Sequence, residues 1–114
     1  MTSKDTVFLV TNYGMGKGPE DLQLKLIGKF LLLLEQGDDP PAVLCFYTEG
    51  VKLVVEGSPV LDRLVALEKK GMRLIACSTC LDYFGLTDKI RAGIAGSMAD
   101  ILEAISRADK VITL

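Results

Sequence analysis

The sequence lacks histidine altogether and contains only three cysteines among its 114 residues. Histidine is the commonest general base and metal ligand in proteins, so its absence excludes histidine-dependent hydrolysis within one chain. A four-cysteine zinc site would need thiols from two chains, or carboxylates in their place. An odd number of cysteines also argues against the disulfide framework of a small secreted protein. We therefore expect reduced thiols, and neither a metal nor a cofactor.

Clustered positive charge and long apolar runs are absent as well. The net charge is −2 and the 13 Lys and Arg residues are scattered along the chain, so we expect no nucleic-acid partner. No apolar run approaches the roughly 20 residues that span a bilayer. The first six residues lack the basic and apolar regions of a signal peptide. The sequence thus predicts a cytoplasmic protein without membrane contact, folded as one domain over residues 1–114.

Short apolar runs alternate with helical patterns along the whole chain. This alternation implies right-handed crossovers between parallel strands. It predicts an α/β fold with three layers, α/β/α, around a mostly parallel five-stranded sheet. A turn is expected at residues 37–41. Strands are expected at residues 5–11, 42–48, 73–76, 93–96 and 110–114, and helices at 19–36, 51–56, 59–70, 78–84 and 98–108.

Small polar residues and glycines mark where several of these helices begin and end. Ser58, which precedes a proline, and Ser97 are expected to be N-caps, because a serine oxygen can accept a free backbone N–H of the first turn. Ser78 or Thr79 is expected to cap the short helix at 78–84, and Gly85 to end it.

The helix at 19–36 carries more leucine than one sheet face can bury. Leu31 to Leu34 alone cover about 300° of a helix at 100° per residue. A partner subunit would cover the excess, and a hydrophobic fraction of 49% points the same way, so we expect a homo-oligomer. The stripe expected to face the sheet contains Leu22, Leu26, Ile27, Phe30, Leu33 and Leu34.

Two of the cysteines lie at the predicted junction of a strand and a helix. Cys77 follows the strand at 73–76, and Cys80 is three residues further on. Ligands of open α/β sheets bind outside the carboxyl ends of the strands, and backbone N–H groups there favour a thiolate. The pair is open to persulfide chemistry, to dithiol redox chemistry or to simple packing. Cys45 falls inside a predicted strand and is expected only to pack.

Further candidate residues flank these thiols or lie in a glycine-rich loop. The loop contains Asn12, Gly14 and Gly16 and follows the first predicted strand. Its glycine spacing does not match a phosphate-binding motif, so it is either a tight active-site loop that binds substrate or a simple turn. Asp82 and Tyr83 follow the thiols, and Asp82 either positions a substrate or is merely solvated.

Four segments resemble the DsrE-like domain of the YedF family, which is associated with selenium metabolism. They are Val-Thr-Asn-Tyr-Gly-Met-Gly, Phe-Tyr-Thr-Glu-Gly-Val-Lys-Leu-Val, Glu-Gly-Ser-Pro-Val-Leu and Ala-Cys-Ser-Thr-Cys-Leu-Asp-Tyr-Phe-Gly-Leu. The resemblance implies a DsrE/DsrF-like fold, homo-oligomers and sulfurtransferase-like relay of sulfur through a cysteine persulfide. Cys77 matches the sulfur-carrying cysteine of the wider family, and Cys80 is its expected catalytic partner.

The resemblance also bears on partners. YedF-type proteins carry a TusA-like domain with its own Cys-Pro motif, which this sequence lacks, so the chain is expected to be either a stand-alone domain or one domain of a larger protein. Sulfur-donor and sulfur-acceptor proteins, such as a TusA-like domain, are the expected partners. The residues do not distinguish selenium from sulfur. Two alternatives stay open: a non-catalytic assembly or regulatory module of sulfur or selenium metabolism, and a dithiol redox protein that uses Cys77 and Cys80.

Overall fold

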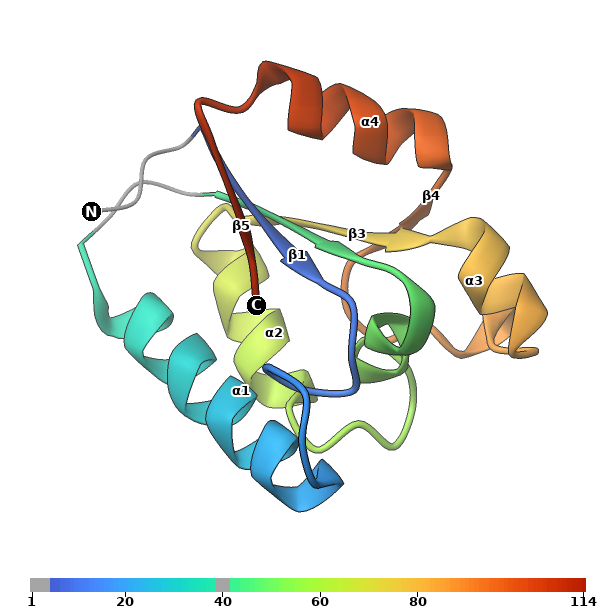
Figure 1. Ribbon diagram of the computed structural model, residues 1–114, viewed down its shortest axis with the longest axis horizontal. Coiled ribbons are helices and arrows are strands. Elements are labelled where there is room, and N and C mark those ends of the chain that lie inside the picture. The colour runs from blue at the N-terminus through green and yellow to red at the C-terminus, as the bar shows by residue number, and fades with distance from the viewer. Residues whose placement is uncertain (1–4, 39–41) are drawn as a thin grey trace.

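The computed structural model describes residues 5–38 and 42–114, and its core is an all-parallel sheet of five strands in the order β4-β3-β2-β1-β5 (Figure 1). The predicted α/β fold is confirmed. The strands are β1 (Thr6–Val10), β2 (Val43–Phe46), β3 (Arg73–Cys77), β4 (Ile94–Gly96) and β5 (Lys110–Thr113). The helices are α1 (Glu20–Gln36), α2 (Leu61–Lys69), α3 (Ser78–Tyr83) and α4 (Met98–Arg107), with 3₁₀ helices η1 (Thr48–Leu53) and η2 (Thr87–Lys89).

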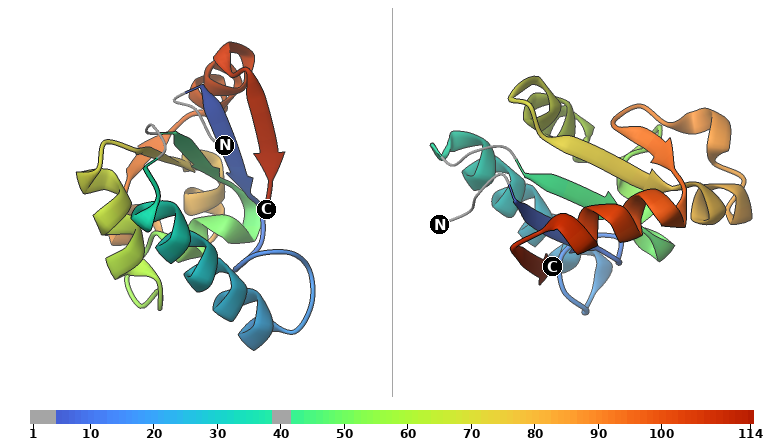
Figure 2. Two further views of the ribbon diagram at one scale, coloured as in Figure 1. Left: turned by 90° about the vertical axis from the view of Figure 1, so that its left-hand side faces the viewer. Right: turned by 90° about the horizontal axis from the view of Figure 1, so that it is seen from above.

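Helices cover the sheet unequally on its two faces. The helices α1 and α2 pack side by side on one face, α4 lies on the other, and α3 extends from one end of the sheet (Figures 1 and 2). Phe8 meets Phe30 of α1 edge to face, with ring centroids 5.5 Å apart. Residues in register on neighbouring strands share a face, so Leu44 and Leu74 also face α1 and α2.

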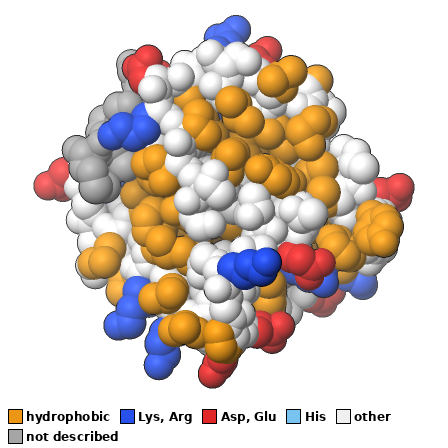
Figure 3. Space-filling model, viewed as in Figure 1, with side chains coloured by type: hydrophobic (Ala, Val, Ile, Leu, Met, Phe, Trp, Pro, Cys, Tyr) orange, Lys and Arg blue, Asp and Glu red, His pale blue; other side chains and the backbone are white. Residues whose placement is uncertain are grey.

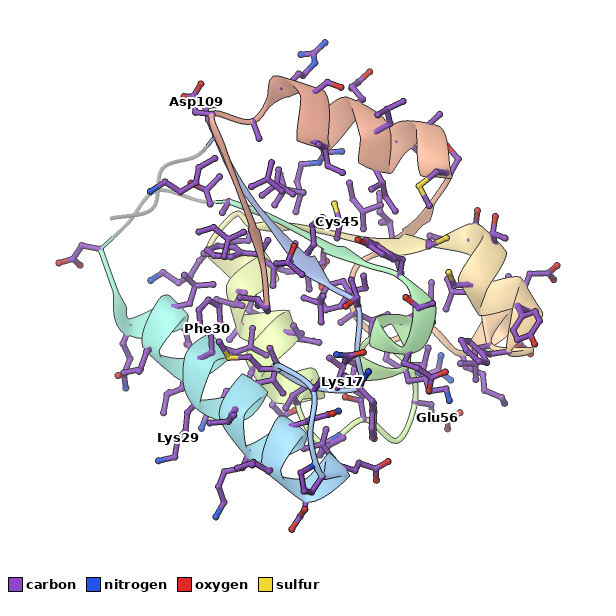
Figure 4. The ribbon with its side chains drawn as sticks, in the orientation of Figure 1. Lys17, Lys29, Phe30, Cys45, Glu56 and Asp109 are labelled. Carbon is purple, nitrogen blue, oxygen red and sulfur yellow. The ribbon has the colours of Figure 1, made fainter. Side chains whose placement is uncertain are left out.

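The opposite face presents the alternate residues of the same strands toward α4. Leu9, Cys45 and Ile75 are in register, and all three are buried. Figure 4 shows Cys45 on the side of the sheet toward α4. Ile101 and Ala104 of α4 are buried against this face. The position of Cys45 agrees with its predicted packing role.

The stripe of α1 that faces the sheet differs from the predicted one. The residues of α1 that are fully buried are Ile27, Leu31 and Leu34, with Leu24 and Phe30 partly buried against the core. Leu22, Leu26 and Leu33, which were expected to face inward, are exposed instead. Because α1 carries apolar side chains on more than one side, its sequence is compatible with two stripes. Packing against β1 and α2 selects the one that includes Leu31.

Helix caps agree with the sequence at α4 and differ from it at α2 and α3. Ser97 forms a reciprocal capping box, accepting the Asp100 N–H while its own N–H donates to the Asp100 carboxylate at 2.8 Å. The helix α2 begins at Leu61, because the Ser58 hydroxyl accepts the Val60 N–H in a turn that precedes the helix.

The predicted boundaries of two further helices are also wrong. The N-cap of α3 is Cys77 rather than Ser78 or Thr79. The helix expected at 51–56 is the 3₁₀ helix η1, which begins at Thr48 and ends at Leu53. The glycine after α3, Gly85, has the left-handed φ of +69° expected of a helix stop. Of the predicted turn at 37–41, residues 39–41 lie outside the described part of the chain.

Candidate functional site

The segments that follow β1, β2 and β3 meet at the carboxyl end of the sheet (Figure 1). A glycine loop follows β1, η1 follows β2, and α3 follows β3 directly. The N–H of Tyr47 donates to the Val10 carbonyl at 3.1 Å and holds the ends of β1 and β2 together. The helix η1 packs against α3, which brings side chains from distant parts of the sequence together.

The position of η1 depends on two residues at its start. A Cβ on Gly50 would overlap the carbonyl oxygen of Val10, so only glycine allows η1 to lie this close to β1. Thr48 has a positive φ of 50°, which is uncommon for a residue other than glycine. In this conformation the Thr48 N–H donates to the Sγ of Cys80 at 3.2 Å. The tight turn after β2 thus points a backbone donor at a thiol.

The two predicted catalytic cysteines are adjacent but differ in exposure. Cys77 ends β3 and is only 1% exposed, whereas Cys80, on the first turns of α3, is partly exposed. The two thiols lie close enough for Cys77 to act on the ionisation of Cys80. An external reagent therefore reaches Cys80, and Cys77 lies behind it.

Several effects act on the Cys80 thiol. Partial burial raises the pKa of Cys80 above its ordinary value, and the hydrogen bond and charge of Cys77 raise it further. The Thr48 N–H lowers the pKa of Cys80 because it stabilises the thiolate. The balance keeps this thiol protonated at neutral pH, so its reactions need a base or a donor that takes up the proton.

A pocket lies at the carboxyl end of α3, beside Lys52 of η1. Phe84 follows Cys80 by four residues, which places both on one side of α3. The Lys52 ammonium lies 4.5 Å from the centroid of the Phe84 ring and 2.7 Å from a carboxylate oxygen of Glu49. Lys52 and Phe84 border a cavity of about 360 Å³ that Tyr13 of the glycine loop and Glu56 also line. Glu56 is at the outer rim of the molecule in Figure 4.

The predicted binding residues of the glycine loop shape the loop and do not line this pocket. The Asn12 amide donates to the Gly16 carbonyl at 2.7 Å, and the Gly14 N–H donates to the Asn12 carbonyl. Gly14 has a φ of +130° and lies against the backbone of Gln23, where a Cβ would not fit. The residue of this loop that enters the pocket is Tyr13.

The two candidates on α3 lie at its outer side. Asp82 is exposed, and Tyr83 is 84% exposed with its ring edge to face with Phe84 at 5.2 Å. Sequence reasoning did not select Thr48, Lys52 or Phe84. Thr48 contributes only its backbone N–H, so its residue type gives no signal.

Neither a metal site nor a membrane span is found in the described part of the chain. Among residues 5–38 and 42–114, no three His, Cys, Asp or Glu side chains lie close enough to hold a metal ion. None of the helices in those ranges combines the length and apolar character needed to cross a membrane.

Three solved structures are similar to this chain over nearly their whole length. The ychN protein from E. coli has a TM-score of 0.70 and 24% identity, and covers 96% of this chain and 98% of its own. MTH1491 from Methanobacterium thermoautotrophicum has a TM-score of 0.70 and 20% identity, with coverage of 96% and 97%. BT1422 from Bacteroides thetaiotaomicron has a TM-score of 0.69 and 16% identity, with coverage of 96% and 95%. At these identities the similarity establishes the fold.

The family comparison covers the chain more specifically. No curated protein matches the chain. The DsrE/DsrF-like family, which is associated with sulfur metabolism, matches residues 4–114. This match includes β1 to β5 and both cysteines of the β3–α3 junction. The chain therefore belongs to the DsrE/DsrF-like family.

Proposed function

We propose that this protein relays sulfur, or selenium, as a persulfide at the Cys77–Cys80 pair. The observation that carries the proposal is the arrangement of Cys80, a partly exposed thiol whose sulfur accepts a backbone N–H and lies close to a second, buried thiol. A persulfide carrier needs an accessible cysteine sulfur with stabilisation for the thiolate, and little else. Cys80 is partly exposed, and the Thr48 N–H is a donor for its thiolate once a base or the sulfur donor has taken up the proton. It lies at the carboxyl end of a parallel sheet, where ligands of such folds bind.

The transfer is a pair of balanced displacements. The Cys80 thiolate attacks the outer sulfur of a donor persulfide, the donor's sulfur–sulfur bond breaks, and the donor leaves as a thiolate. An acceptor thiolate then attacks the outer sulfur of the Cys80 persulfide and releases the Cys80 thiolate. The Thr48 N–H stabilises this thiolate at the start and at the end of the cycle. No net oxidation occurs and no cofactor is required.

We also propose that the chain belongs to the YedF-type group within its family. Its substrates would be persulfides on partner proteins. The segments at 46–54 and 76–86 support the YedF-type assignment. Tyr83 and Asp82 lie on the outside of α3 next to the thiols, where they would meet a docked partner such as a TusA-like domain. A persulfide cycle needs reduced thiols, which agrees with a cytoplasmic protein.

A second candidate function, a non-catalytic assembly module, is favoured by different observations. Cys77 is buried, as a packing cysteine would be, and large apolar side chains are exposed on α1 and α4. In that case neither thiol would exchange sulfur. The third candidate, a dithiol redox protein, is favoured by the contact between the two thiols, and it predicts a reversible disulfide without a stable persulfide.

The deciding experiment is the intact mass of the reduced protein after incubation with a persulfide donor, for the wild type, Cys77→Ser and Cys80→Ser. Relay through Cys80 predicts a sulfur-sized, reductant-sensitive mass gain in Cys77→Ser and none in Cys80→Ser. A gain that survives in Cys80→Ser and disappears in Cys77→Ser would make Cys77 the carrier, as the family resemblance implies. If no variant gains mass and both thiols resist alkylation until the protein unfolds, relay is wrong and the assembly module remains.

A further inference from the structure

The two cysteines of the β3–α3 junction lie at different depths below the protein surface. Cys77 is 1% exposed and Cys80 is partly exposed, so an incoming donor or acceptor meets Cys80 first. The thiol of Cys77 is close to that of Cys80 and is the more buried of the two. Because external reagents do not reach Cys77, its chemistry passes through the sulfur of Cys80.

This arrangement fixes the direction from which Cys77 can react. Thiol–disulfide exchange proceeds in line, with the attacking sulfur, the attacked sulfur and the leaving sulfur roughly collinear. Because Cys77 is buried and Cys80 is partly exposed, a persulfide at Cys80 has room for its outer sulfur on the solvent side. Attack by Cys77 on the inner sulfur would then come from the buried side.

We propose that Cys77 discharges the Cys80 persulfide when no acceptor thiol takes the sulfur, releasing hydrosulfide and closing a Cys77–Cys80 disulfide. This inference rests on the proposed persulfide at Cys80. The Cys80 persulfide can then react in two ways. An acceptor thiol attacks its outer sulfur from solvent, or Cys77 attacks its inner sulfur from the interior. The persulfide persists only as long as an acceptor arrives before the buried thiol reacts.

The discharge step balances without an external oxidant. The Cys77 sulfur forms a bond to the Cys80 Sγ, and the bond between that Sγ and the outer sulfur breaks with its electron pair leaving on hydrosulfide. The proton of Cys77 passes to the hydrosulfide or to water. The outer sulfur is reduced to sulfide and the two cysteines are oxidised to a disulfide, which a dithiol reductant must reduce before the next cycle.

The local geometry allows the disulfide. Side chains three residues apart at a helix start are neighbours, with Cβ atoms about 5 to 6 Å apart in a regular helix. Cys77 is the N-cap of α3 with a ψ of 117°, so it is outside the regular helix. A disulfide requires about 4 Å between the Cβ atoms, so its formation involves an adjustment at this terminal residue, which the regular helix does not hold.

The experiment is a single turnover without oxygen. The reduced protein is loaded with glutathione persulfide and desalted at once, and the mass of the protein and the hydrosulfide trapped by bromobimane are followed over time. The wild type is expected to lose its sulfur-sized gain and finish two hydrogens lighter than the reduced protein, with one hydrosulfide per disulfide. Cys77→Ser is expected to hold the persulfide roughly tenfold longer or more, because the internal thiol is gone.

One control variant, one alternative readout and the opposing outcomes complete the test. Cys45→Ala, which removes a buried thiol on β2, is expected to discharge at the wild-type rate. If Cys77→Ser misfolds, the wild type alone tests the discharge. Equal yields of hydrosulfide and disulfide would support it, and persulfide loss without disulfide would overturn it. Equal persulfide lifetimes in the wild type and Cys77→Ser, with no disulfide, would overturn the discharge and leave relay standing. Failure of folded Cys77→Ser to load at all would overturn relay through Cys80, and the discharge with it.

Discussion

At the scale of single residues, the environment of Cys80 is set by two neighbours that act in opposite directions. Cys77 raises the pKa of the Cys80 thiol through a hydrogen bond and through its charge, in addition to the larger effect of burial. The Thr48 N–H lowers the pKa of Cys80. Removal of the Cys77 thiol should therefore lower the pKa of Cys80.

Cys77→Ala is expected to lower the pKa of Cys80. The substitution removes a hydrogen bond that favours the neutral thiol and a charge that repels the thiolate. The rate of Cys80 alkylation by iodoacetamide, followed by peptide mass, should then rise at a lower pH than in the wild type. An alkylation profile with the same midpoint in both proteins would mean that Cys77 does not influence this thiol.

Cys45 makes a second prediction, about stability at high pH. Burial raises the pKa of Cys45 to about 11 from an ordinary value of 9.0. The folded state keeps this proton longer than the unfolded chain, so the contribution is complete below pH 9 and is lost as the pH rises toward 11. The loss amounts to about 2 to 3 kcal/mol in the free energy of unfolding.

Urea unfolding of the wild type and Cys45→Ala at pH 7 and near pH 10.5 checks this. Cys45→Ala should cost about 1 kcal/mol at pH 7, because it removes a buried sulfur. The difference should shrink as the pH rises and reverse its sign near pH 10.5, because only the wild type has this thiol to ionise and its loss there, about 2 kcal/mol, exceeds the cost of the substitution. Other titrating groups are common to both proteins and cancel. A difference that stays constant with pH would contradict the prediction.

At the scale of secondary-structure elements, the sequence predicts the regular strands better than the turns that build the site. Residues 6–10 and 74–77 are continuous apolar or β-branched runs, a pattern that signals a buried strand. The residue type of Thr48 does not indicate its positive φ. Tertiary contacts of η1 with β1 and α3 impose this conformation, and local sequence does not encode them. The cap at Ser97 was predictable from local pattern, whereas Ser58 has a similar pattern and closes a turn instead.

Gly50→Ala is expected to displace η1 and to weaken both stability and Cys80 chemistry. The new Cβ would overlap the Val10 carbonyl, which belongs to the backbone and cannot rotate away. A loss of about 2 kcal/mol or more in the free energy of unfolding is expected, since a packed site is overfilled. Because Thr48 must move with η1, the variant should also lose the N–H bond to Cys80, seen as a higher pKa of this thiol.

Gly18→Ala is the matched control for this substitution. Gly18 has no positive φ and an added Cβ meets no atom within 4 Å. It should be neutral or stabilising by up to about 1 kcal/mol, because alanine restricts the unfolded chain. Equal stability of the two variants would show that the close approach of η1 to β1 is not required.

Caps supply a fourth prediction. Ser97→Ala should cost about 1 kcal/mol, because it removes the serine half of the capping box of α4. Ser78→Ala should change the free energy of unfolding by less than about 0.5 kcal/mol, since Ser78 is inside α3 and Cys77 is the N-cap. Thermal or urea unfolding separates the two; similar costs would contradict the assignment of these caps.

At the scale of the whole molecule, large apolar side chains remain exposed on two sides of the sheet. Leu22, Leu26 and Leu33 lie on α1, and Met98 and Leu102 lie on α4. In Figure 3 hydrophobic atoms gather across the middle of the face that carries β5. The sequence indicated this excess through its four consecutive leucines but not which residues make it up, because the rotation of α1 depends on packing that local pattern does not encode.

We predict a homo-oligomer that covers at least one of these surfaces. Sedimentation of the wild type at micromolar concentration should give more than one subunit, and Leu33→Glu or Leu102→Glu should lower the mass, since each side chain is over 60% exposed and the substitution does not disturb the core. Tyr83→Ser is the control, an exposed aromatic beside the thiols. A monomeric wild type would contradict the prediction.

The order of the strands also bears on how the chain acquires its fold during synthesis. β1 is made first, yet one of its edges is paired only by β5, at residues 110–113. A nascent chain that ends before Lys110 would therefore hold β1 as an edge strand, with a row of backbone donors and acceptors open to a strand from another chain. Loss of β5 through early termination or proteolysis would thus leave β1 exposed as an edge strand, on which other chains could aggregate.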